Sequence, residues 1–288
     1  MKIKTWVTIG ITYVALVIAG YSVITGENPL QSGDMDHEGH VEQSSQTEGS
    51  EDHGAHEDQD ITQEDDHMND HQHQGVESEI QTEVTYDNER IQIDLMDDEG
   101  NAPELEVTHE KEMHLIVVSE DLETFIHHHP EKESEGTFYV DTSLDHGRYK
   151  AFVDIQPKDK DYVIEANDLV VGDHPTTEEA ALTVDTSMTK ERSDKTVTLN
   201  ASGLEVGEEA TLAFDLHGEE PQPYLGALGH VVILDEAAEN FIHVHPVSEN
   251  ETVFETHFAE PGLYKVWVEF DFSDQDVVAF PFVIEVQS

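Results

Sequence analysis

From Tyr86 to its end, the chain consists of short segments in which apolar residues alternate with polar ones or form brief apolar runs. Turn residues separate these segments, as in the acidic stretch 97–101 that follows the alternating segment 90–95. This pattern is typical of β-strands, and no sustained helical period follows the N-terminal stretch. The expected strands are 90–95, 104–109, 113–119, 125–128, 137–142, 148–155, 162–171, 196–201, 210–216, 230–234, 241–244, 252–258, 263–270 and 277–286.

The segments 230–234 and 241–244 flank a polar turn centred on Ala237 and Ala238, and together they predict a β-hairpin. With this turn, His230 lies directly opposite His245, and His243 lies two residues along the same strand. Opposed residues, and residues two apart on one strand, share a face of the sheet. The three histidines are therefore expected on one face, and a shift of the register by one residue would separate them.

The same pattern occurs earlier in the chain, which indicates an internal duplication. In both copies a histidine precedes a phenylalanine by eleven residues, the motif His-x-His-Pro follows, and a Gly-x-Tyr-Lys motif comes later. The repeat is about 90–100 residues long, which is a common domain size. The first copy is expected to gather its own three histidines, and each copy to bind one divalent ion. The two predicted sets are His114, His127 and His129, and His230, His243 and His245.

About seven short strands per repeat, with frequent turns, predict two tandem immunoglobulin-like β-sandwich domains. Their expected boundaries are 86–185 and 190–288, with the polar segment 172–194 between them. The tyrosine of each Gly-x-Tyr-Lys motif fits a tyrosine corner, in which the hydroxyl reaches back to the backbone at the entry of a strand.

Composition narrows the range of partners. The chain carries 65 acidic and 13 basic residues, for a formal charge of −52, so nucleic acid and anionic lipid headgroups are not expected partners. The acidity extends through the predicted domains, which indicates adaptation to salty or alkaline surroundings. No cysteine is present, which excludes disulfides, thiolate metal sites and cysteine nucleophiles.

The N-terminus predicts a membrane anchor in residues 1–26. Lys2 and Lys4 precede an uncharged, mostly apolar run from Trp6 to Ile24, a length close to one bilayer span. The lysines place the N-terminus in the cytoplasm, so the expected location is the cell membrane, single-pass, with the bulk of the chain outside. A cleavable signal peptide, which would leave a secreted protein, is the alternative.

Residues 27–85 predict a disordered acidic tether. This stretch holds eighteen Asp or Glu residues, seven histidines and no Lys or Arg, and it has too few apolar residues to form a core. Histidines among carboxylates bind Zn²⁺ or Cu²⁺ weakly, so the tether is expected either to collect metal ions or to act only as a solvated spacer.

Several motifs also resemble a family of exported bacterial proteins. These are the segments 223–230 and 261–267 and the His243–Pro246 motif, and the segment 109–130 resembles the first repeat of that family in Bacillus-type bacteria. The resemblance covers about residues 86–288 and leaves out the tether. It implies a secreted or membrane-anchored β-sandwich protein linked to heavy metals.

The duplicated histidines predict metal sites, because neutral imidazole is a good ligand for Zn²⁺ and Cu²⁺, and three imidazoles leave a position for water or a fourth group. The expected function is extracytoplasmic, membrane-tethered binding of Cu or Zn in metal homeostasis or resistance, without catalysis. No protein partner is predicted. His128, His257, His109, His146, His174 and His217 are not assigned to the sites, and the last four are expected to be surface or turn residues.

Two alternatives remain open. The spacing His-x-His-x-x-x-Glu at 127–133 and 243–249 resembles the first half of a cupin metal motif and would imply a metal-dependent enzyme, but the second half of the motif is not matched. The other alternative is a purely structural or adhesive surface β-sandwich, in which the histidines are exposed or bonded to the backbone.

Overall fold

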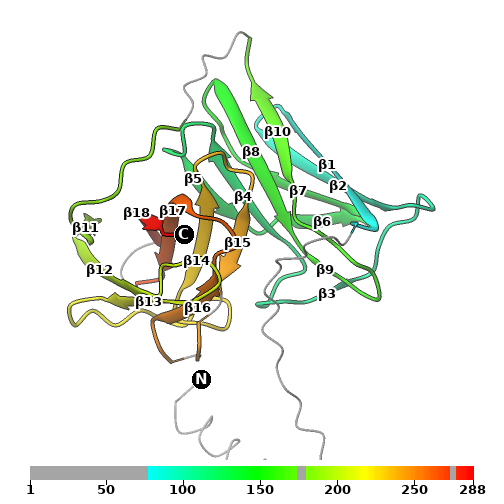
Figure 1. Cartoon of the computed structure of the whole chain (residues 1–288). Helices are drawn as coiled ribbons and strands as arrows, with labels where there is room; N and C mark the ends of the chain where they lie inside the picture. The colour runs from blue at the N-terminus through cyan, green and yellow to red at the C-terminus, as the bar shows by residue number, and fades with distance from the viewer. Residues whose placement is uncertain (1–76, 174–179, 245, 249, 273–276) are drawn as a thin grey trace, which may run out of the picture. The chain divides into compact units, whose positions relative to one another are not determined.

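A computed structural model describes residues 77–173, 180–244, 246–248, 250–272 and 277–288, apart from the side chain of His243. Every regular element in these ranges is a β-strand, which confirms the all-β prediction (Figure 1). Within the same ranges, no helix has the length and apolarity needed to span a membrane. The expected transmembrane helix of residues 1–26 and residues 27–76 of the expected tether lie outside the described residues.

The first domain is a sandwich of two four-stranded antiparallel sheets. One sheet has the order β1 (Ile80–Asp87), β2 (Arg90–Asp97), β7 (Thr137–Asp141) and β6 (Glu131–Ser134). The other has the order β10 (Ala166–Val171), β8 (Gly147–Asp154), β4 (His114–Ser119) and β5 (Phe125–His128). A short ribbon joins β3 (Leu105–Glu106) to β9 (Gln156–Pro157).

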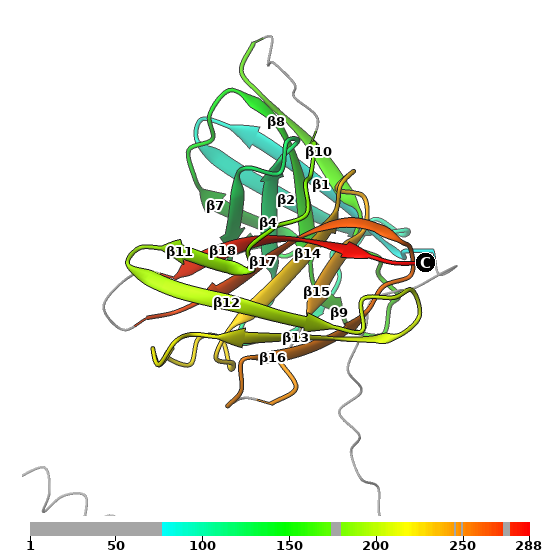
Figure 2. The same ribbon diagram turned by 60° about the vertical axis from the view of Figure 1, so that its left-hand side comes forward.

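The second domain repeats this plan. Its first sheet has the order β11 (Thr189–Arg192), β12 (Lys195–Ser202), β13 (Glu209–Asp215) and β16 (Val253–His257). Its second sheet has the order β15 (Phe241–Val244), β14 (His230–Asp235), β17 (Gly262–Phe270) and β18 (Val278–Val286). Figure 2 shows the second domain from another side, with β12, β13 and β16 lying side by side.

The strand order of the first domain is immunoglobulin-like. The arrangement β1-β2-β7-β6 against β10-β8-β4-β5 corresponds to strands A, B, E and D against G, F, C and C′. In the second domain β12, β13 and β16 take the places of A, B and E, and β11 adds an edge strand beside β12. The prediction of two tandem β-sandwich domains is therefore confirmed for the described residues.

The central strands explain how the two domains pack on each other. In β4 the run Leu115–Val118 is buried on both faces of the sheet, and so is Val231–Leu234 in β14. The inward residues of each run belong to the core of their own domain, whereas the outward residues form a third apolar cluster that both domains share. A continuous apolar run, in place of alternation, is typical of a strand covered on both sides. Members of the shared cluster are Ile116, Val118, Leu122, Phe152, Val232, Leu234, Ala238 and Trp267.

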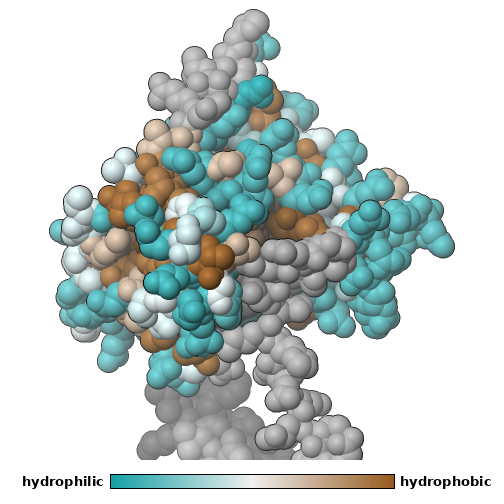
Figure 3. Space-filling model, viewed as in Figure 1, coloured by the Kyte–Doolittle hydropathy of each residue, from teal (hydrophilic) through white to brown (hydrophobic). Residues whose placement is uncertain are grey.

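Two aromatic stacks across this interface are related by the duplication. Phe125 stacks on Trp267 with ring centroids 4.9 Å apart, and Phe241 stacks on Phe152 at 5.1 Å. Phe125 and Phe241 hold equivalent places in the two hairpins, so each domain contributes the same pair of positions to the other. Both domains lie within one compact unit, Glu64–Ser288. Outside the interface, the face of the molecule in Figure 3 is mostly polar.

Both tyrosine corners predicted from Gly-x-Tyr-Lys are present. The hydroxyl of Tyr149 donates a hydrogen bond to the carbonyl of Asp145 (3.0 Å), and that of Tyr264 to the carbonyl of Glu260 (2.9 Å). Both rings are buried in the core of their own domain.

Removing either hydroxyl is expected to lower stability by about 1 kcal/mol, because a partly buried hydrogen bond is lost while the ring still fills its place. Tyr149→Phe and Tyr264→Phe test this in urea unfolding of the full chain. Tyr139→Phe is the control, since its hydroxyl bonds to Glu131 in an exposed position. Midpoints no lower than that of the control would contradict the structural role of the corners.

Asp97 gives the first domain a pH-dependent contribution to stability. Its Oδ1 accepts a hydrogen bond from the backbone N–H of Asn101 (2.8 Å), and its Oδ2 lies 3.3 Å from Nζ of Lys160. The hydrogen bond from Asn101, and after it the bond from Lys160, lowers the pKa of Asp97 below its ordinary value. A lowered pKa means that the carboxylate stabilises the folded state above its unfolded pKa of about 3.9 and loses this effect as pH falls through the folded pKa.

Asp97→Asn is therefore expected to be less stable than the native chain at pH 7 and to approach it in stability at pH 3. Urea unfolding of both chains at the two pH values measures the difference. A gap of the same size at both pH values would show that the charge of Asp97 is not responsible.

Four strands were not expected from the sequence: β1, the edge strands β6 and β11, and the two-residue β9. β1 begins at Ile80, so residues 80–85 belong to a strand and not to the expected tether. Only Ile80 and Val84 of this strand are buried, and the acidic residues around them conceal the alternation. The edge strands β6 and β11 were not predicted, because they have no buried residue and therefore no apolar period.

Candidate metal centre

The histidines of the first domain gather because the hairpin has the predicted register. Ile116 pairs with His127 across β4 and β5. His114 lies two residues before Ile116, and His129 lies two residues after His127, so the three histidines share one face of the sheet. The hairpin of the second domain has the same register, with the pairs Val231–Val244, Val232–His243, Ile233–Ile242 and Leu234–Phe241.

One ring nitrogen from each of His114, His127 and His129 lies within 4.8 Å of the others. Nδ1 of His114 and Nε2 of His127 are 3.1 Å apart. Ring centroids are 4.9 Å apart for His114 and His129, and 4.8 Å apart for His127 and His129. His114 is 1% exposed, and the side chain of His127 is 2% exposed. The trio is thus a compact and largely buried group of donor atoms.

Hydrogen bonds at the far side of two rings fix which nitrogens face each other. Nε2 of His114 contacts the carbonyl of Thr108 (3.3 Å), and Nδ1 of His127 contacts Oε2 of Glu269 (2.5 Å). A carbonyl and a carboxylate only accept, so these ring nitrogens carry the hydrogens. In the neutral rings, Nδ1 of His114 and Nε2 of His127 then carry lone pairs. Two lone pairs at 3.1 Å repel unless a proton or a metal ion lies between them.

Each domain has an equivalent turn that holds the first histidine of its set. His230 Nε2 donates to the carbonyl of Tyr224 (2.9 Å), as His114 does to that of Thr108, six residues earlier in each case. The next residue has a positive φ in both turns, +49° at His109 and +54° at Leu225. The isolated bridges Thr108–Lys111 and Tyr224–Ala227 close these turns in the same way. Both repeats therefore retain the histidine and also the turn whose carbonyl accepts its hydrogen bond.

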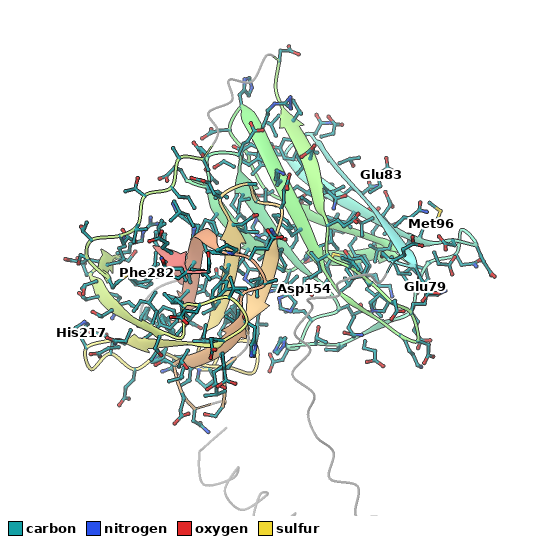
Figure 4. The ribbon with its side chains drawn as sticks, in the orientation of Figure 1. Glu79, Glu83, Met96, Asp154, His217 and Phe282 are labelled. Atoms are coloured by element: carbon teal, nitrogen blue, oxygen red, sulfur yellow. The ribbon has the colours of Figure 1, made fainter. Side chains whose placement is uncertain are left out.

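Glu269 connects the second domain to the trio. It lies near the end of β17, is 7% exposed, and receives the hydrogen bond from His127 of the first domain. Burial raises the pKa of Tyr224, and the negative charge of Glu269 raises it further. Asp154, labelled in Figure 4, holds the equivalent position near the end of β8 and is also buried.

The second predicted set is only partly described. His230 is 1% exposed, and its ring centroid lies 6.5 Å from that of His114 and 6.2 Å from that of His127. The side chain of His243 and the whole of His245 lie outside the described residues, so the second trio stays a prediction. The structure does bring His230 next to the trio of the first domain, whereas the sequence predicted two separate sites.

Two residues of this neighbourhood were not among the predicted site residues. The ring of His109 lies 6.2 Å from the rings of both His114 and His230, and Glu269 contacts His127. A sequence signal existed for His109, which begins the resembling segment 109–130. For Glu269 the only signal is its alignment with Asp154, four or five residues after the duplicated Tyr-Lys pair.

Three of the histidines that were not assigned to a site lie in other surroundings: His128, His217 and His257. His128 points to the opposite face, and its Nε2 lies 3.1 Å from Oγ1 of Thr142. Burial, and then the neighbouring His127, lowers the pKa of His128. His217 lies 2.8 Å from Oγ1 of Thr198 in an exposed position, and His257 is exposed on β16, in the other sheet of the second domain.

The family comparison matches both domains. A family described as "Domain of unknown function (DUF8832)" matches residues 69–170 and 190–288. The chain belongs to this family. The two DUF8832 matches fall one on each β-sandwich, which confirms the internal duplication. Because the description gives no function, the link to heavy metals stays a prediction. A comparison with curated proteins finds no match.

Among solved structures, the two DUF8832 domains are similar to domains FN1–FN3 of chicken CNTN1, at 12% identity over 72% of this chain and 66% of that chain, with a TM-score of 0.22. The Escherichia coli adhesin FdeC matches at 15% identity over 73% and 65%, with a TM-score of 0.23. A two-domain fibronectin type-III segment of chicken tenascin matches at 10% identity over 71% and 97%, with a TM-score of 0.22. The chain spans about two thirds of the CNTN1 and FdeC structures. At these TM-scores the similarities carry no functional argument.

Proposed function

We propose that the first domain binds a divalent transition metal ion, Cu²⁺ or Zn²⁺, through His114, His127 and His129. The observation that carries the proposal is the group of three ring nitrogens within 4.8 Å, with the 3.1 Å approach of two of them. Around an ion with bonds of about 2.0–2.1 Å, the ligand atoms of a tetrahedral site are about 3.3 Å apart. The 3.1 Å separation of the nitrogens of His114 and His127 is close to that value, and a donor nitrogen of His129 lies within 4.8 Å of both.

The surroundings of the trio support the same proposal. Metal-bound histidines usually donate their second ring N–H to a backbone carbonyl or a carboxylate, which fixes the ring and raises its basicity as a ligand. Thr108 and Glu269 supply these acceptors for His114 and His127. Imidazole without thiolate suits Zn²⁺ and Cu²⁺ and does not favour Cu⁺, and the chain has no cysteine.

We propose a binding role rather than catalysis. Near the trio, the described residues are histidines, tyrosine and carboxylates, with no arrangement of nucleophile and base. The biological role we propose is metal homeostasis or resistance, carried out outside the cytoplasm by a chain tethered to the membrane through residues 1–26. The acidic, histidine-rich segment 27–85 would supply weaker sites that raise the local concentration of metal ions.

The proposal predicts that His127→Ala combined with His129→Ala removes one equivalent of bound Zn²⁺ or Cu²⁺ from the full chain. Equilibrium dialysis followed by elemental analysis measures the equivalents, and the tether contributes equally to both chains. His129→Ala alone is a second variant, because it leaves the contact between His127 and Glu269 intact. The metal-dependent rise in melting temperature should shrink in both variants, since only the folded state has the site.

His217→Ala combined with His257→Ala is the matched control, because it removes two histidines from exposed positions in the described part of the chain. It should retain the full number of equivalents. Equal losses in the control and in the test variants would mean that the trio is not a metal site.

A structural or adhesive surface protein is the second candidate. The observation that favours it is the shared apolar cluster with its two aromatic stacks, which joins the domains without any metal. On this alternative, a proton lies between His114 and His127, and Glu269 balances its charge. The dialysis experiment distinguishes the two candidates, because this alternative predicts the same metal content in all variants.

A further inference from the structure

We infer that the second domain is part of the metal centre, with Glu269 as the residue that positions His127, so that metal binding and the docking of the two domains are thermodynamically linked. This inference rests on the proposed function of the trio. It adds a positioning residue, a composite site and a physical role for the interface between the repeats.

The carboxylate of Glu269 occupies a position where burial has a cost in free energy. Glu269 is 7% exposed, and burying a charge is costly unless the charge is hydrogen-bonded or paired. Its described partner is His127, 142 residues away and in the other domain. The nearest lysine along β17, Lys265, pairs instead with Glu123 of the first domain. The carboxylate is thus directed to an imidazole of the trio, where it has the geometry of an outer-shell acceptor.

The duplication gives the first domain a carboxylate at the same position. Asp154 is the equivalent of Glu269, and each carboxylate pairs across the sheet with the first histidine of its own domain, Asp154 with His114 and Glu269 with His230. The aromatic stacks exchange partners between domains in the same reciprocal way. Both repeats therefore keep a buried carboxylate at this position, beside an interface whose aromatic contacts are reciprocal.

Metal binding and the docking of the two domains are linked through the ring of His127. An ion bound by His127 stabilises the ring orientation that Glu269 requires, and Glu269 reaches that ring only when the domains are docked as described. By reciprocity, any factor by which docking raises metal affinity is also the factor by which metal strengthens docking. The stack of Trp267 on Phe125 joins the same two strands, two residues before Glu269 and His127.

Glu269→Gln in the full chain tests the inference. Loss of an outer-shell partner typically weakens metal affinity by about 10–100-fold, so we expect the tightest equivalent of Zn²⁺ to bind more weakly by that factor in competition with a chromophoric chelator. The number of equivalents should stay unchanged, because Glu269 is not a ligand. Glu285→Gln is the control, since it removes an exposed carboxylate from the neighbouring strand of the same sheet.

A second readout separates positioning from general stability. In the native chain, ¹⁵N spectra of the His127 ring should show the hydrogen on Nδ1, and Glu269→Ala should lose this preference while the shifts of His217 stay unchanged. If the variant with both His127→Ala and His129→Ala loses an equivalent but Glu269→Gln binds Zn²⁺ as tightly as the native chain, the composite site is wrong and the trio stands alone. If that double variant loses nothing, the proposed metal function itself fails.

Discussion

Replacing Trp267 with alanine is expected to lower the free energy of unfolding by about 3–5 kcal/mol, the usual range for truncating a buried Trp or Phe. Trp267 is 3% exposed, stacks on Phe125 of the other domain, and belongs to the cluster that the two domains share. It is not part of the core of the second domain, so that sandwich should still fold. Urea unfolding of the full chain measures the loss.

A double-mutant cycle shows whether this loss arises at the interface. Phe125→Ala and Trp267→Ala should be coupled by about 0.5–1.5 kcal/mol, because each removes the stacking partner of the other. Val170→Ala is the control, since this residue is 52% exposed and its loss should stay within about 0.5 kcal/mol. Strictly additive effects of the two aromatic substitutions would contradict the described packing of the domains.

Gly203→Ala is expected to destabilise the second domain by on the order of 3–5 kcal/mol, at the upper end of single-residue effects. Gly203 has φ +70°, and an added Cβ would lie 2.1 Å from the carbonyl oxygen of Glu209. That oxygen belongs to the backbone of β13, so the turn between β12 and β13 would have to open.

Gly207→Ala in the same turn is the matched control. Its φ is +78°, but nothing lies within 4 Å of the position of an added Cβ. It therefore has only the conformational cost of the left-handed region, about 1–2 kcal/mol. Melting curves of both variants give the comparison, and equal losses would show that the contact with Glu209 is not the cause.

The parts of the fold that depend on local pattern were predictable. The apolar runs of β14 and β15 and the turn centred on Ala237 and Ala238 predicted the register of the second hairpin, and the duplication extended that register to β4 and β5. The shared face of His114, His127 and His129 follows from it. The Gly-x-Tyr step predicted both tyrosine corners. In each case a short segment contains the whole determinant, either a period of two residues or a single hydrogen bond to a nearby residue.

The parts that depend on packing between the repeats were not predictable. The run Leu115–Val118 shows that β4 is covered on both faces, but it does not identify the second domain as the cover. Glu269 joins the site only because the domains pack face to face, and its partner His127 lies 142 residues away. His109 lies beside the site because its turn has a positive φ, and the pattern of apolar residues does not predict such a turn.

X-ray absorption at the zinc edge, on the full chain loaded with a single equivalent of Zn²⁺, tests the central claim most directly. The account predicts about three imidazole nitrogens at about 2.0–2.1 Å, together with the multiple-scattering features of imidazole rings. In His129→Ala, the number of imidazoles should fall by one. A shell of oxygen ligands alone, or the same imidazole count in His129→Ala, would contradict the proposal that His114, His127 and His129 form the metal centre.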